Sequence, residues 1–277
     1  MTDFRTPVSL GTTGLKVGRL GIGSSFGAST KVIEDAAERG ANYLYWGSIR
    51  RPAFGRAMGN LARRDRASVV LTIQSYSRVP ALIAPSVEIS LRRVGVEYFD
   101  FLLLGKWDKR PGDGLLEAAL RLKEQGKVRH LMMSTHNRPL LASMFEEYDK
   151  GESPFDVFMF RYNAVHRGAE KDVFPFLPAG PKPGILTYTT TRWGHLLDPK
   201  KMPPGETPPP ASDCYRFALS NENVDVALCG PADEAQMEEA LRALERGPLK
   251  PDERERIERI GDFIYGRHKP NYEDLGD

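Results

Sequence analysis

Hydrophobic and polar residues follow two alternating patterns along this chain. Short apolar runs rich in β-branched and aromatic residues recur eight times, as expected for β-strands. Between them lie stretches with apolar residues three and four positions apart, the spacing of amphipathic helices. The predicted strands are residues 19–23, 41–45, 69–73, 99–104, 128–133, 156–160, 184–188 and 224–229, and the clearest predicted helices are 32–40, 86–95, 115–126 and 233–247.

The order of these elements predicts the fold class. Strand starts are about 22 to 40 residues apart, the length that one strand and one crossover helix require. Such alternation gives a parallel sheet with right-handed connections. Eight units in 277 residues predict a closed (β/α)8 barrel, a TIM barrel, rather than an open doubly wound sheet. We expect one domain over residues 1–277.

Three segments lie outside this repeat. Residues 8–18 alternate around small turn residues, which predicts an N-terminal β-hairpin that closes the bottom of the barrel. Residues 251–264 predict a C-terminal helix on its outside. Residues 202–212 contain five prolines and cannot form a helix or a central strand. They are expected to form an ordered loop or a lid, with the prolines at 203–210.

Composition excludes several classes of partner. The chain has 39 basic and 37 acidic residues and lacks an apolar run near 18 residues. Neither nucleic acid nor a membrane is therefore the expected partner, and a small molecule is. With only Cys214 and Cys229 and a polar start, we expect a reduced, cytoplasmic protein without disulfide or metal site. Its oligomeric state is not predicted.

Candidate ligand-binding residues follow the predicted strands, where this barrel class carries its active sites. Guanidinium groups bind phosphates and carboxylates, and indoles stack on flat rings. We therefore expect an anionic ligand at a shared opening. Alternatively, each arginine pairs with a nearby carboxylate, such as Glu170 or Asp108, and only fixes its loop. The residues expected at this opening are Trp46, Arg50, Arg51, Lys106, Trp107, Arg161, Asn163, His166, Arg167, Arg192 and Trp193.

Several ordered segments resemble the aldo-keto reductase superfamily. The resemblance implies a (β/α)8 barrel that reduces carbonyls with NADPH, and it covers nearly the whole chain. The segments that carry it are LGTTGLKVGRLGIGSSFG (10–27), ERGANYL (38–44), SLRRVGVEYFDFLLL (90–104), LKEQGKVRHLMMST (122–135), FDVFMFRYN (155–163) and PGILTYTTTRWGHLL (183–197).

The resemblance also implies that the catalytic tetrad is missing. The family uses Asp, Tyr, Lys and His, in which Tyr donates a proton to the carbonyl oxygen. The matching positions here are Tyr45 for Asp, Arg50 for Tyr, Gln74 for Lys and Gly105 for His.

These replacements change the expected chemistry. Arg50 keeps its proton near neutral pH, although it can stabilise an oxyanion, and Gln74 offers no charge. The candidates for a rearranged proton donor are Tyr45, Lys106 and His136, with His166 as a further alternative.

Cofactor residues are partly retained in the comparison with the family. Ser134 matches a family serine, and Tyr188 keeps the aromatic ring that stacks on nicotinamide. Thr135 and Met159 replace the Asn and Gln expected near the carboxamide.

At the adenosine end, Gly230, Gln236 and Glu239 are retained. Ala232, Asp233 and Glu234 replace the basic residues that hold a 2′-phosphate. Acidic groups repel that phosphate, so the expected cofactor is NAD or NADP with a preference for NAD.

Three functions remain open on this basis. The first is a divergent, nicotinamide-dependent aldo-keto reductase-like oxidoreductase that acts on a small carbonyl or anionic substrate through a different proton donor. The second is a non-catalytic homologue that binds an anion in a ligand-binding or regulatory role. The third is lyase, isomerase or hydrolase chemistry, because this fold hosts many reactions.

Overall fold

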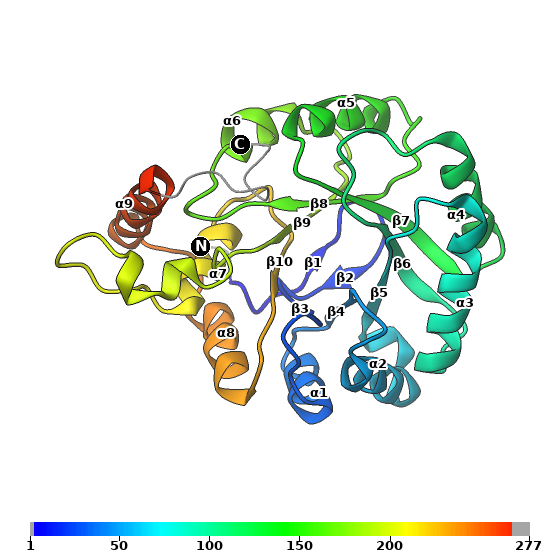
Figure 1. The fold of residues 1–277 in the computed structure, drawn as a ribbon, viewed down its shortest axis with the longest axis horizontal. Coiled ribbons are helices and arrows are strands. Elements are labelled where there is room, and N and C mark those ends of the chain that lie inside the picture. The colour runs from blue at the N-terminus through cyan, green and yellow to red at the C-terminus, as the bar shows by residue number, and fades with distance from the viewer. Residues whose placement is uncertain (1–2, 268–277) are drawn as a thin grey trace.

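A closed barrel of parallel strands forms the centre of the molecule (Figure 1). The computed structural model describes residues 3–267. The barrel order is β10-β3-β4-β5-β6-β7-β8-β9, so the predicted (β/α)8 architecture is confirmed. Its strands are β3 (Leu20–Gly23), β4 (Tyr43–Trp46), β5 (Val70–Ser75), β6 (Phe99–Leu104), β7 (Val128–Thr135), β8 (Val157–Arg161), β9 (Gly184–Tyr188) and β10 (Val226–Cys229).

Helices surround the barrel in Figure 1 and cover the outward faces of the strands. Glycines end several of them as predicted: Gly40, Gly95, Gly126 and Gly247 have φ of 101°, 76°, 71° and 67°. The helices are α1 (Thr30–Glu38), α2 (Pro52–Arg64), α3 (Ile83–Val94), α4 (Asp113–Glu124), α5 (Arg138–Asp149), α6 (Ala169–Asp172), α7 (Ala211–Leu219), α8 (Glu234–Arg246) and α9 (Pro251–Arg267).

The N-terminal hairpin closes one end of the barrel, as predicted. Strands β1 (Val8–Ser9) and β2 (Lys16–Val17) pair antiparallel. Leu10 and Val17 are fully buried and join the cluster of inward-facing strand residues. Gly11 lies so close to the start of β9 that a Cβ on it would be 2.2 Å from the Gly184 nitrogen. The hairpin therefore seals the amino-terminal end of the strands.

The last helix and the proline-rich segment pack together. Glu206 accepts hydrogen bonds from Arg256 of α9 at 2.9 and 3.1 Å, and Arg259 lies 3.3 Å away. The prolines at 203–210 thus belong to an anchored loop. The predicted non-helical segment was two residues too long, because α7 begins at Ala211. Over residues 3–267, none of the helices combines the length and apolar character that crossing a membrane demands.

Candidate functional site

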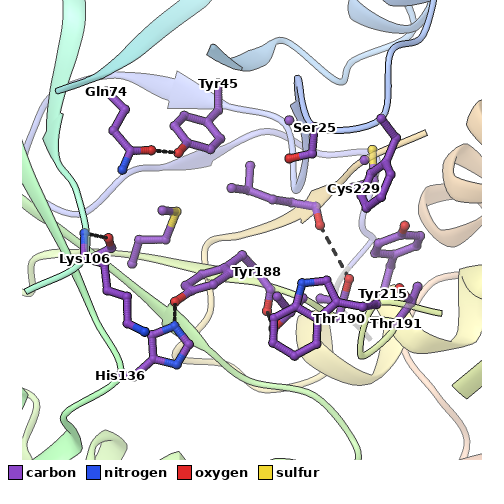
Figure 2. A pocket seen from close by; sticks show the side chains of 18 of the residues that line it. Ser25, Tyr45, Gln74, Lys106, His136, Tyr188, Thr190, Thr191, Tyr215 and Cys229 are labelled. Carbon is purple, nitrogen blue, oxygen red and sulfur yellow. Dashed lines mark hydrogen bonds between the residues drawn. The ribbon is translucent and has the colours of Figure 1, made fainter. Parts of the chain in front are cut away.

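A cavity of about 400 Å³ opens at the carboxyl ends of the barrel strands; we call it the inner pocket (Figure 2). Its volume is within the range typical of small-molecule sites. Aromatic side chains supply much of its wall: Phe26, Tyr45, Tyr76, Tyr188, Trp193 and Tyr215.

A second cavity of about 660 Å³ adjoins the inner pocket and extends over the start of α8; we call it the α8 cavity. The two cavities share wall residues, so they form one groove from the barrel mouth to α8. The shared residues are Phe26, Thr191, Trp193, Tyr215 and Gly230.

One wall of the inner pocket is a neutral pair. The Tyr45 hydroxyl, at the end of β4, donates a hydrogen bond to Gln74 Oε1 on β5 (Figure 2). Burial raises the pKa of Tyr45 well above its ordinary value. Gly105 makes room for this pair, because a Cβ there would lie 1.8 Å from Gln74 Nε2. Tyr45 and Gln74 therefore hold each other, and the phenol stays protonated.

The opposite wall carries a tyrosine and a histidine in contact. Tyr188 Oη, on the last residue of β9, lies 2.5 Å from Nε2 of His136, which follows β7. Their rings meet edge-on, with centroids 5.6 Å apart and planes at 73°. Burial raises the pKa of Tyr188, while the nearby positive charge of Arg161 opposes that rise.

Lys106 also lines the inner pocket, and its side chain extends toward the His136 ring in Figure 2. Its loop is fixed by Ser134, the residue predicted to bind cofactor. The Lys106 backbone N–H donates to Ser134 Oγ at 2.9 Å, and the Trp107 N–H donates to the Ser134 carbonyl at 2.9 Å. Ser134 thus lines the pocket and sets the position of Lys106.

The loop after β9 is strained where it borders the pocket. Thr189, Arg192 and Trp193 have φ of 56°, 54° and 51°, a left-handed region that non-glycine residues rarely adopt. The Thr189 carbonyl accepts from Asn163 Nδ2 at 2.9 Å and from the Arg192 N–H at 2.8 Å. Such strain persists only where contacts enforce it, and it is common in functional loops. The buried side chain of Asn163 therefore stabilises this loop.

Several residues expected at the opening lie elsewhere. Trp46 is buried, and its indole N–H donates to the Arg51 carbonyl at 3.0 Å. Arg51 donates to the Ser25 carbonyl at 2.6 Å, and Arg50 is exposed outside the pocket wall. The indole of Trp107 packs under the Arg78 guanidinium, 3.7 Å from its centroid. The predicted convergence was wrong for these four side chains, because the loops after β4 and β6 turn them away.

The arginines and histidine of the later loops are also dispersed. Arg161 and Arg192 are 7% and 2% exposed and do not form the pocket wall, although the Arg192 guanidinium lies over the ring of Trp193. His166 and Arg167 face a separate cavity of about 380 Å³ beside α9. Arg167 pairs with Asp262 at 2.6 Å rather than with Glu170. Among the described residues, Lys106 is the only lysine or arginine in the inner pocket wall.

The α8 cavity contains the residues predicted at an adenosine site. Gly230, Gln236 and Glu239 all line it. Asp233 is the N-cap residue of α8, and its carboxylate accepts from the Gln236 N–H at 2.9 Å. No lysine or arginine belongs to the described wall of this cavity, whereas Asp233 and Glu239 do. An additional phosphate therefore lacks a cationic partner here.

Of the remaining residues predicted to bind the cofactor, some line the inner pocket and one does not. Met159 and Tyr188 line the inner pocket. Thr135 is fully buried outside the wall, where its hydroxyl accepts from the Asn137 N–H at 2.8 Å.

Sequence reasoning missed Phe26, Tyr76 and Tyr215, which line the inner pocket. Tyr76 was within reach of the strand-end rule, because it directly follows β5. Phe26 is in the loop after β3, and Tyr215 is on α7, which was not among the clearest predicted helices.

Two features of the groove bear on binding a dinucleotide: an aromatic ring at one end and a glycine at the junction of the cavities. Tyr188 presents an aromatic ring beside the inner pocket, and Gly230 lies where the two cavities meet. A Cβ on Gly230 would approach the Phe26 ring to 2.9 Å, so glycine keeps the junction open. The acidic wall of the α8 cavity fits ribose hydroxyls better than a 2′-phosphate.

Comparison with solved structures supports the fold. An aldo-keto reductase of Bacillus halodurans, AKR11C1 in its holo form, matches with a TM-score of 0.74 and 21% identity, covering 92% of this chain and 96% of that one. An aldo/keto reductase of Klebsiella pneumoniae, solved with NADP and acetate, gives 0.73 and 18% identity, over 93% and 96% of the two chains. This chain therefore shares their barrel fold.

Sequence similarity to curated proteins covers a smaller part of the chain. Two Saccharomyces cerevisiae proteins named as aryl-alcohol dehydrogenases, AAD14 and AAD10, are 29% and 28% identical over 92 residues, 32% of this chain. Those residues span only 24% and 32% of the two relatives. No family model matches the chain.

Proposed function

We propose that this protein is an aldo-keto reductase-like oxidoreductase that binds a nicotinamide dinucleotide and reduces a small carbonyl compound. The continuous groove from the inner pocket to the α8 cavity is the observation that carries the proposal. It offers an aromatic pocket for one ring and a glycine-lined junction toward α8 for the other. The barrel likeness to two aldo-keto reductases agrees with this assignment.

In this site, Tyr188 and Met159 would border the nicotinamide ring. Gly230, Gln236 and Glu239 would lie along the adenosine half. The bound nucleotide supplies a hydride, and the aromatic walls exclude water from the carbonyl. The acidic wall makes NADH the preferred donor over NADPH.

Fluorescence titration tests the proposal. Trp193 lines both cavities and is 39% exposed, so bound NADH should quench its emission. We expect NADH to bind at least tenfold more tightly than NADPH, because the 2′-phosphate meets carboxylates. Trp193→Phe should remove the quenching while binding persists by calorimetry. Absence of binding of both nucleotides at millimolar concentration would contradict the proposal.

A charge variant tests the preference itself. Ala232 is an exposed residue in the wall of the α8 cavity, so Ala232→Arg places a guanidinium near the proposed ribose. The ratio of the NADH and NADPH dissociation constants should shift toward NADPH by about tenfold. Ala232→Gln is the neutral control, with an unchanged ratio expected.

The neutral Tyr45–Gln74 pair favours a second candidate, a protein that binds its ligand without turnover. Its ligand would occupy the same groove with Lys106 as the cation in the inner pocket wall. Single-turnover mixing of the NADH complex with an activated aldehyde separates the two. Loss of NADH absorbance supports the reductase, and stable absorbance supports the binding protein.

A further inference from the structure

The charge of the inner pocket wall limits which ligands the pocket accepts. Lys106 is the one lysine or arginine in the described wall, and no aspartate or glutamate belongs to that wall. Burial raises the pKa of the Tyr45, Tyr188 and Tyr215 hydroxyls. It also raises the pKa of the Cys229 thiol to about 12, so these acidic groups of the wall are neutral near neutral pH. The wall therefore has a positive potential, which favours an anionic ligand over a cationic one.

The backbone of Lys106 is fixed on both sides of its Cα. Its N–H donates to Ser134 Oγ at 2.9 Å, and its carbonyl accepts a hydrogen bond from the Arg78 guanidinium. Arg78 is itself held over the Trp107 ring, 3.7 Å from the centroid. The half-buried side chain of Lys106 extends toward His136 in Figure 2. The loop after β6 thus presents the ammonium group to the inner pocket from a fixed backbone position.

Three large aromatic side chains of the same wall are exposed to solvent. Phe26, Tyr76 and Trp193 are 57%, 65% and 39% exposed, and they come from the loops after β3, β5 and β9. Exposed aromatic rings that gather around one cavity are typical of a binding site for a flat apolar group. The inner pocket therefore combines an aromatic rim with one positive charge.

The number of cations distinguishes a carboxylate from a phosphate as the anionic group. A phosphate ester carries a charge of about −1.5 to −2 near neutral pH and is best bound by several charged donors. The described wall offers one ammonium group and no guanidinium. This single charge matches that of a carboxylate.

We propose that the substrate of the inner pocket is an aromatic aldehyde or ketone that carries a carboxylate, and that Lys106 binds this carboxylate. The inference rests on the proposed function and names its substrate class. During reduction the carbonyl carbon gains a C–H bond from hydride, its π-electron pair moves to the oxygen, and that oxygen gains a proton from solvent. The sum is carbonyl acid, reduced nucleotide and one proton giving hydroxy acid and oxidised nucleotide, and the carboxylate is unchanged.

Two substrates that differ by one charge test the role of Lys106. The first probe is para-formylbenzoate, and the second is its neutral methyl ester, which has the same ring and aldehyde. We expect the wild-type kcat/KM for the acid to exceed that for the ester at least tenfold, through a lower KM, because only the acid accepts a charge-assisted hydrogen bond. Lys106→Met should remove this preference, and Lys106→Arg should keep most of it.

A neighbouring lysine provides the matched control. Lys109 follows in the same loop, but it is exposed and lies outside the described wall of the inner pocket. Lys109→Met should therefore keep the wild-type ratio of the two kcat/KM values. The dissociation constant of NADH should stay within twofold in Lys106→Met, which separates a substrate-binding lysine from a cofactor-binding one.

The product alcohols give a readout that does not require turnover. In calorimetry, para-hydroxymethylbenzoate should bind the wild-type protein at least tenfold more tightly than its methyl ester does. Lys106→Met should bind the two compounds with equal affinity, and Lys109→Met should behave as the wild type.

The outcomes separate this inference from the proposed function. If the wild-type protein binds no nicotinamide nucleotide, the proposed function fails and the substrate class fails with it. If the wild type binds NADH but reduces or binds acid and ester equally well, only the inference fails. A loss of kcat/KM by the same factor for both substrates in Lys106→Met would also overturn it, because the ammonium group would then act on the carbonyl or the cofactor.

Discussion

Gly105 lies against the side chain of Gln74, which Tyr45 holds by a hydrogen bond. These residues come from three neighbouring strands or the turns after them. The side chain at one of these positions therefore limits which side chains fit at the other two. A side chain at position 105 would have to displace Gln74, and Gln74 leaves only by breaking its bond to Tyr45. At residue scale, the inner pocket wall is therefore a set of mutually dependent side chains.

A double-mutant cycle measures this dependence. Gly105→Ala should lower the free energy of unfolding by about 1 to 3 kcal/mol, because its Cβ overlaps the Gln74 amide. In a Gln74→Ala background the same change should cost less, giving a coupling of at least about 1 kcal/mol in urea denaturation. Gly114→Ala, with its nearest atom 3.7 Å away, is the control and should not destabilise. If the free-energy costs of the two substitutions simply add, the Gly105–Gln74 contact does not constrain the pocket wall, which would contradict this prediction.

Single residues also show how far the sequence could locate the pocket. Tyr45, Gln74, Lys106, His136 and Tyr188 lie at or just after strand ends and do line it. Proximity to a strand end does not fix direction, however. Arg167 is in the loop after β8, yet it points to Asp262 of α9, a partner 95 residues away that no local pattern reveals.

At the scale of elements, Arg216 joins α7 to the ends of two other helices. Its side chain is 3% exposed and bonds Asp213, the Gly247 and Pro248 carbonyls after α8, and Glu253 of α9. Because a buried guanidinium needs all its donors satisfied, this network sets how α7, α8 and α9 meet. Residues of α7 and α8 line the α8 cavity.

Removing the guanidinium should therefore be costly. Arg216→Ala leaves the Gly247 and Pro248 carbonyls without this donor, while Asp213 and Glu253 keep their contacts with Arg246. We expect a loss of about 1 to 3 kcal/mol in the free energy of unfolding. Arg242→Ala is the control, because its pair with Glu239 is 63% exposed on the arginine side and should cost under about 1 kcal/mol. Equal midpoints in urea would contradict a structural role for Arg216.

The helices absent from the sequence prediction have physical reasons for being missed. Helix α7 is nine residues long and buries eight in a row, Ser212–Leu219, including the polar Asp213 and Arg216, so it lacks the long stretch with a solvent-exposed polar face that marks the predicted helices. Helix α2 contains two glycines, which lower helix propensity. Strands were easier to predict, because parallel barrel strands are buried on both faces and appear as continuous apolar runs.

The stability of the whole molecule should depend on the protonation of one carboxyl group, Asp225, at the closed end of the barrel. Asp225 precedes β10 in a cavity beside Gly11 and Thr12 of the hairpin, and it accepts from the Ile185 N–H at 2.8 Å. Burial is the main cause that raises its pKa to about 6. The folded protein therefore holds this proton more tightly than the unfolded chain does.

Stability should consequently fall as pH rises from about 4 through 6, by about 2 to 3 kcal/mol from this group alone. Asp225→Asn keeps an acceptor for Ile185 and should flatten this part of the unfolding profile. Other carboxylates act at lower pH: Arg216 lowers the pKa of Glu253 to about 2, so its contribution is lost only as pH falls from about 4.5 to 2. An unaltered slope in Asp225→Asn would contradict the assignment.

The closed hairpin end of the barrel also limits how ligands enter and leave the inner pocket. With Leu10 and Val17 filling that end, whatever reaches the inner pocket must depart by its route of arrival. Product and incoming substrate must then use the same opening of the inner pocket. Under the proposed function, excess alcohol product should therefore slow turnover by competing with the carbonyl substrate for the inner pocket.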